Sequence, residues 1–186
     1  MALASIAFSI GAFSIAAILS GMFLLGKDKG KGSEKTLGVI NVFVGLAIGI
    51  SSLLLLLTTP FGTTSPATNV ELMFSLLQLI FAFVWATFGF ALLNGWDMKF
   101  IGSMTLVLFI YNLITFLLVP ALWSGAFTAA GLVIVELTLL SYLADEVGFW
   151  AVTHGKMKGA PQGWILIISG FLSIILAVVV GGILPL

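Results

Sequence analysis

Six apolar runs of about 20 residues each dominate this sequence of 186 residues. A helix of that length crosses the roughly 30 Å hydrocarbon core of a bilayer and satisfies its own backbone hydrogen bonds there. The runs lack the polar–apolar alternation of a membrane β-barrel strand. They therefore predict an all-α integral membrane protein, a single domain over residues 1–186, with spans at approximately residues 3–25, 36–58, 71–93, 100–119, 127–144 and 164–184.

Composition supports this class and excludes several functions. The chain is 61% hydrophobic and 8% charged, whereas soluble domains carry about 25% charged residues. It contains no cysteine, no arginine and one histidine, and it has no phosphate-binding glycine loop and no metal-ligand motif. A net charge of zero argues against a nucleic-acid partner. We expect a protein that is not an enzyme, uses no cofactor or metal, and has the lipid bilayer as its environment.

Lysines are confined to three of the five segments that connect the runs. They are Lys27, Lys29, Lys31 and Lys35 after the first run, Lys99 after the third, and Lys156 and Lys158 after the fifth. Because positively charged loops stay on the cytoplasmic side, these three segments are predicted to be cytoplasmic. With six spans, both termini are then predicted to be extracytoplasmic.

Polar and small residues within the runs have two interpretations. The amides Asn41, Gln78 and Asn112 are equally compatible with hydrogen bonds between helices and with the lining of a pore. The glycines favour close approach of helices, with Gly45 and Gly49 forming a G-x-x-x-G pair and Gly89 and Gly170 as further contacts.

Glu136 is the exceptional residue, because it is a carboxylate in the middle of the fifth run. Such a group costs about 2.5–3.5 kcal/mol at the centre of a span. One interpretation is a protonated acid that is hydrogen-bonded to a neighbour such as Asn112 or Gln78 and has no part in transport. The other places Glu136 on a solute path, where it accepts hydrogen bonds from N–H groups or carries a proton.

Several segments resemble the AmiS/UreI family of urea and amide channels. They are "GAFSIAAILSGMFLLGK" in the first run, "TLGVINVFVGLAIGI" in the second, "ATFGFALLNGWDMKFIG" across the third and fourth, and "PQGWILIISGFLSIILA" in the sixth. The resemblance covers nearly the whole chain. It implies a six-helix protomer with its own central pore, assembled into a ring-shaped homo-hexamer, that passes urea or short amides passively.

The resemblance also implies candidate pore residues, with a partly altered aromatic constriction. Phe88 retains an aromatic side chain, but Leu92 stands where the urea channel has a tyrosine. Two tryptophan positions of the fifth span are occupied by Leu132 and Glu136, and Ser169 replaces a glutamate of the sixth. Carried over position by position, the pore candidates from the family are Phe88, Leu92, Leu132, Val135, Glu136 and Ser169.

Three hypotheses follow from these observations. The first is a passive channel for urea or short-chain amides in a bacterial inner membrane, supplying a cytoplasmic urease or amidase. The second is a proton-coupled transporter of a small polar solute, with Glu136 as the proton site. The third is a membrane scaffold without transport activity, in which Glu136 fixes helix register.

Overall fold

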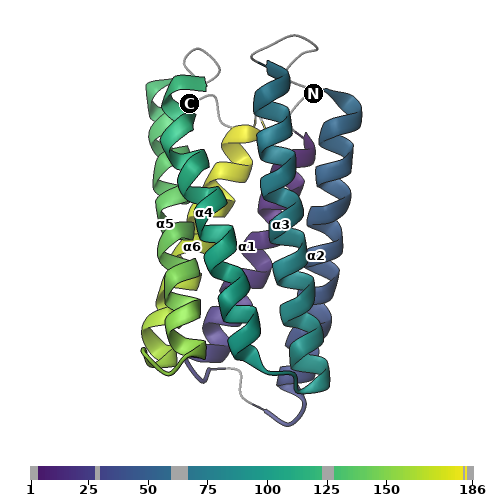
Figure 1. Cartoon of the computed structure of the whole chain (residues 1–186), viewed down its shortest axis with the longest axis vertical. Helices are drawn as coiled ribbons and strands as arrows, with labels where there is room; N and C mark the ends of the chain where they lie inside the picture. The colour runs from purple at the N-terminus through teal and green to yellow at the C-terminus, as the bar shows by residue number, and fades with distance from the viewer. Residues whose placement is uncertain (1–3, 28–29, 60–66, 123–127, 182, 184–186) are drawn as a thin grey trace.

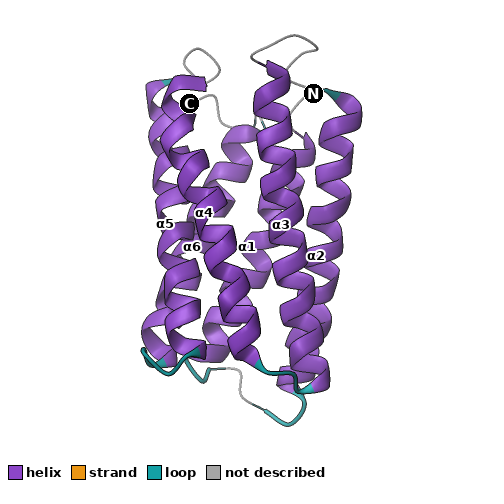
Figure 2. Cartoon of the chain, viewed as in Figure 1, coloured by secondary structure: helices purple, strands orange, loops and turns teal. Residues whose placement is uncertain are grey.

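The computed structural model describes residues 4–27, 30–59, 67–122, 128–181 and 183 of the chain. All secondary structure in these residues is helical (Figure 2). The six helices are α1 (Ala4–Leu24), α2 (Ser33–Thr58), α3 (Ala67–Asn94), α4 (Met98–Leu122), α5 (Ala129–Thr153) and α6 (Gly159–Val180).

The helices form a closed ring in chain order. Each helix contacts the next one in the sequence, and α1 also contacts α6. Successive helices run in opposite directions, so the two ends of the chain lie at one end of the bundle (Figure 1). This ring surrounds a central axis, and the side chains that point inward decide what that axis contains.

The opposite end of the bundle carries the lysines, and we call it the lysine end. The described residues of the three short connections lie there, namely 25–27, 30–32, 95–97 and 154–158 (Figure 1). The described lysines at this end are all exposed: Lys27, Lys31, Lys35, Lys99, Lys156 and Lys158. Lys29 lies outside the described residues. We call the other end, which holds both termini, the terminal end.

Glycine pairs bring two pairs of helices into backbone contact. A Cβ on Gly89 of α3 would lie 2.5 Å from the carbonyl oxygen of Gly38 on α2, and one on Gly21 of α1 would lie 2.5 Å from that of Gly163 on α6. Real Cβ atoms do not approach backbone this closely. These positions therefore require glycine if the helices are to keep this spacing.

The glycines expected to allow close approach behave unequally. At Gly45 an added Cβ would lie 2.6 Å from the backbone nitrogen of Ala86, and at Gly170 it would lie 3.0 Å from the carbonyl oxygen of Ser14. At Gly49 the same atom would make an ordinary contact of 3.5 Å. The G-x-x-x-G pair thus has one tight member and one loose member.

Five of the described helices, α1 to α4 and α6, are long and apolar enough to cross a membrane. Large apolar side chains are exposed on the outside of the ring, among them Phe43, Phe83, Phe100, Leu117 and Phe171. Exposing so much apolar surface to water would be unfavourable, whereas lipid tails are as apolar as these side chains and can cover them. The chain therefore has the character of a multi-pass helical membrane protein.

The fifth helix departs most from the expected boundaries. The predicted span ended at residue 144, but α5 continues to Thr153 and includes Asp145 and Glu146. Every stretch of 18 residues in α5 holds three carboxylates. By composition, α5 is therefore not as apolar as the other five helices. The prediction stopped early because two adjacent acids normally mark the end of a span, and here they are buried inside the bundle.

The remaining boundaries differ by a few residues, apart from the start of α6, which begins at Gly159 rather than at residue 164. The early start places Gln162 in the first turns of α6, where it is fully buried. The predicted limits at residues 3, 127 and 184 fall outside the described residues.

Candidate functional site

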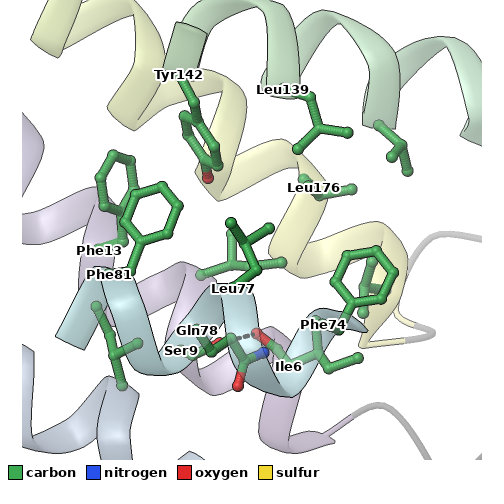
Figure 3. Close-up of a pocket in the computed structure, with 14 residues that line it drawn as sticks. Ile6, Ser9, Phe13, Phe74, Leu77, Gln78, Phe81, Leu139, Tyr142 and Leu176 are labelled. Carbon is green, nitrogen blue, oxygen red and sulfur yellow. Dashed lines mark hydrogen bonds between the residues drawn. The ribbon is translucent and has the colours of Figure 1, made fainter. Parts of the chain in front are cut away.

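Three aromatic side chains meet on the central axis, halfway along the bundle. Phe13 of α1 lies edge-on to Phe81 of α3 and to Tyr142 of α5, with ring centroids 5.5 and 4.7 Å apart. Phe81 and Tyr142 also contact each other, at 5.4 Å. Figure 3 shows the three rings converging from their separate helices. We call these three residues the aromatic constriction.

A small cavity lies between the constriction and the terminal end. Its volume is about 70 Å³, and its walls are almost entirely apolar, with Phe74, Leu77 and Leu139 among them. The polar groups of the lining come from Ser9, Gln78 and the hydroxyl of Tyr142 (Figure 3). The hydroxyl of Ser9 donates to the carbonyl oxygen of Ile6 at 2.9 Å. The Gln78 side-chain oxygen is buried and has no hydrogen-bond partner. Gln78 therefore brings one unpaired acceptor to the wall of this cavity, which we call the terminal-end cavity.

A larger cavity lies between the constriction and the lysine end. Its volume is about 290 Å³, and Phe81 of the constriction is part of its wall. Five aromatic rings surround it: Phe23, Phe81, Trp85, Phe88 and Phe149. Its polar lining comes from serine, threonine and two carboxylic acids: Ser20, Thr105, Thr153, Asp145 and Glu146. The axis is thus an hourglass, with a cavity on each side of the aromatic constriction.

The two acids are held by amide side chains of neighbouring helices. Asn112 of α4 donates from Nδ2 to Oε1 of Glu146, and Gln162 of α6 donates from Nε2 to Oδ1 of Asp145. Gln162 Nε2 also lies 3.1 Å from the backbone oxygen of Asp145. We call these four residues the acid–amide cluster. It ties α5 to both of its neighbours in the ring.

The cluster leaves buried acceptors unused. Glu146 is 2% exposed and Asp145 is 8% exposed. Oε2 of Glu146, Oδ1 of Asn112 and Oε1 of Gln162 have no hydrogen-bond partner. Leaving such a group buried and unpaired costs about 1–3 kcal/mol, and more when it is charged. Of these three residues only Glu146 lines the lysine-end cavity. As a carboxylate it is an acceptor, so a molecule in the cavity that complements it must carry N–H or O–H groups.

Space for Gln162 is created by a glycine. A Cβ on Gly148 would collide with Oε1 of Gln162. Gly148 lies one helical turn beyond Asp145 on α5, so the missing side chain lets the amide reach across to the carboxylate. This local feature explains why Gln162 can be fully buried at the junction of α5 and α6.

Four of the residues predicted for the pore line the two cavities. Phe88 and Leu92 line the lysine-end cavity, and Gln78 and Val135 line the terminal-end cavity. Asn112 lines neither cavity but holds Glu146 in place.

The other four predicted pore residues lie away from both linings. Leu132 is half-buried against the apolar core. Ser169 is buried and donates to the carbonyl oxygen of Ser141 at 3.2 Å. Asn41 is fully buried, and neither atom of its amide has a partner.

Glu136 is the most informative of these. It is half-buried and borders neither cavity, whereas its neighbour Val135 does. Adjacent residues on a helix are rotated by about 100°, so Glu136 lies beside the inward face of α5. The expected hydrogen bond from Asn112 goes to Glu146 instead. The buried acids on the axis are therefore Asp145 and Glu146, some 15 Å further along the helix.

The sequence contained a signal for this arrangement. Leu139, Tyr142, Glu146 and Phe149 follow one another at intervals of three and four residues, which is the spacing of one helix face. Continuing that face past residue 144 would have placed Glu146 below Tyr142 on the axis. The contributions of Phe13 and Phe81 had a weaker signal, because the polar residues one turn before them, Ser9 and Gln78, are uncharged.

Among the described residues, there is no group of three or more histidine, cysteine, aspartate or glutamate side chains that could hold a metal ion. Comparison with known proteins adds no relative, since no family model, no curated protein and no solved structure matches this chain.

Proposed function

We propose that the chain is a passive channel for small uncharged polar solutes, namely urea or short-chain amides, which cross along the axis of each protomer. The observation that supports this most directly is the hourglass, because cavities on both sides of the constriction share the wall residue Phe81. A closed ring of six helices, with cavities along its central axis, suits a pore within one protomer. The AmiS/UreI resemblance implies the same solute class.

The chemistry of the walls favours neutral solutes with N–H groups. Unpaired acceptors on Gln78 and Glu146 lie on opposite sides of the constriction and match the donors of an amide. Between them, the rings of Phe13, Phe81 and Tyr142 supply apolar faces with no charge. An ion that entered the constriction would lose its hydration without compensation, which is far more costly than the same step for a neutral amide.

A proton-coupled transporter is the second candidate, and one observation favours it. Two buried carboxylic acids face the lysine-end cavity, and intramembrane acids commonly form proton relays. In this version the proton site is Glu146 rather than Glu136, since Glu136 borders neither cavity.

The lysine end is cytoplasmic and both termini are extracytoplasmic, in accordance with the positive-inside rule. The protein resides in a bacterial inner membrane as a homo-hexamer whose protomers each carry a pore. Its solute is used by a urease or amidase in the cytoplasm.

The decisive experiment is stopped-flow measurement of solute entry into proteoliposomes, with urea, formamide and acetamide tested in parallel. We expect entry faster than into protein-free liposomes, and independent of an imposed proton gradient. Entry that requires the gradient and is lost in Glu146→Gln would favour the coupled transporter. Rates equal to those of protein-free liposomes for every solute would reject both, and would leave a scaffold role.

A further inference from the structure

Within the described part of the chain, the acids of the lysine-end cavity are paired with neutral groups. The hydrogen bonds to the carboxylates of Asp145 and Glu146 come from the amides of Gln162 and Asn112. Thr105 donates to the backbone oxygen of Glu146, at 3.0 Å. No lysine or histidine is among the described residues that line the cavity, and the described lysines are exposed. Two ionisable acids therefore share one cavity, and the described part of its wall has no cationic side chain.

The rest of the wall also suits a cation. Trp85 lies edge-on to Phe88, and Phe88 lies edge-on to Phe149, at centroid distances of 5.9 and 5.2 Å. With Phe23 and Phe81, these rings enclose the space beside the carboxylates. The faces of aromatic rings attract organic cations, most strongly where water is excluded. Cages of aromatic side chains recur at sites that recognise choline and methylated lysine.

The free acceptor sets the hydrogen-bonding character of the guest. Glu146 lines the cavity, and Oε2 of its carboxyl group is buried and has no hydrogen-bond partner. A guest with several N–H groups can donate to this atom and to Asp145 together. The volume of about 290 Å³ exceeds the roughly 10–15 Å³ that a single water requires on the same measure. A small organic cation therefore fits with water molecules beside it.

We propose that the lysine-end cavity is a binding site for small organic cations with N–H donors, of the guanidinium or alkylammonium class, held between Asp145, Glu146 and the surrounding aromatic rings. Such a cation binds below the constriction but does not cross it, because Phe13, Phe81 and Tyr142 offer no carboxylate to replace its water. The inference rests on the proposed function only in its consequence for flux, namely that an occupied cavity obstructs the solute path.

Guanidinium and urea make a matched pair of probes, since both are small, planar and rich in N–H groups but only guanidinium is charged. Titration calorimetry on the purified full-length protein, at equal ionic strength, should show guanidinium binding about tenfold more tightly than urea, as expected for charge-assisted hydrogen bonds. Glu146→Gln and Asp145→Asn should each weaken guanidinium binding by about tenfold and leave urea binding within about twofold. The control Glu136→Gln, on the same helix but away from the cavity, should bind both probes as the wild type does.

The flux assay provides a second readout that separates the two proposals. Guanidinium on the lysine side should slow urea entry in wild type and not in Glu146→Gln. Tight guanidinium binding without urea entry would uphold the site and reject the channel. Urea entry with equal binding of the two probes, or with guanidinium binding unchanged in Glu146→Gln and Asp145→Asn, would reject the cation site and leave the channel intact.

Discussion

The ring of Phe13 lies edge-on against the ring of Tyr142, with centroids 4.7 Å apart and planes inclined at 63°. Their helices, α1 and α5, are not neighbours in the ring, since α6 lies between them. Phe81, on the third helix, contacts both side chains. The constriction is therefore built by three alternate helices, and each contributes one aromatic residue near its middle.

Removing one ring of the constriction should open the axis. We expect Phe81→Ala to join the two cavities, to raise the rate of urea entry several-fold and to admit amides larger than acetamide, as measured by stopped-flow swelling of proteoliposomes. Phe83→Ala is the matched control, because Phe83 is an exposed phenylalanine on the same helix. A Phe81→Ala protein that folds but keeps the wild-type rate and size limit would show that the axis is not the path.

The hydroxyl of Tyr142 provides a finer test of the same layer. It donates a hydrogen bond of 2.6 Å to the hydroxyl oxygen of Ser173, and the Ser173 hydroxyl in turn donates to the backbone oxygen of Ser169. Tyr142→Phe keeps the ring and removes one interhelical bond, which is worth about 0.6 kcal/mol on average in a membrane. A slightly lower thermal unfolding midpoint with an unchanged urea rate is expected. A large change in rate would assign the hydroxyl a direct contact with solute.

The hydrogen bond from Asn112 to Glu146 should be important for stability, since it pairs one oxygen of a buried acid. Asn112→Leu removes the donor, and we expect a loss of about 1–3 kcal/mol in the free energy of unfolding. Most of this loss should be recovered in the double variant Asn112→Leu/Glu146→Met, in which neither position carries a polar group.

Denaturant unfolding in a single detergent would measure this cycle. Asn94→Leu serves as the control, because Asn94 is an exposed amide at the end of α3 that donates only within its own helix; its effect should stay within about 0.5 kcal/mol. Additive effects of the Asn112 and Glu146 substitutions would contradict the pairing.

Close contact between α2 and α3 depends on Gly89, where a Cβ would lie 2.5 Å from the carbonyl oxygen of Gly38 and 2.6 Å from the backbone nitrogen of Val42. Because both obstacles are backbone atoms, Gly89→Ala must push the helices apart, at a cost of about 1–3 kcal/mol. Gly49→Ala, where the nearest atom is 3.5 Å away, should be tolerated. Equal thermal midpoints for the two variants would contradict this packing.

Orientation in the membrane is open to direct labelling, because the chain has no cysteine. A single cysteine at Lys156, exposed at the lysine end, should react with a membrane-impermeant maleimide only after cells are permeabilised. One at Ile183, exposed at the terminal end, should react in intact cells. The reverse pattern would invert the proposed topology and place the acid–amide cluster near the outer face.

Hydropathy along the chain was sufficient to locate the helices. Five of the six helices match the predicted spans closely over most of their length because crossing a bilayer depends on a property summed over about 20 residues. The exception was the end of α5, where Asp145 and Glu146 interrupt the sum although they are buried. Their partners, Asn112 and Gln162, come from helices α4 and α6, so no local window could have revealed that the acids are paired.

The sequence by itself thus determined the membrane class, the number and approximate position of the helices, and the gathering of lysines at one end. Tertiary structure decided which side chains face the axis. In water, the inward face of a helix is its apolar one, but lipid tails and a protein core are equally apolar. The sequence of such a helix therefore only weakly encodes which of its faces points toward the axis. Contacts between distant segments decide this. Those contacts place Phe13, Phe81, Tyr142 and Glu146 on the axis, and they leave Glu136, the residue that hydropathy alone made conspicuous, beside it.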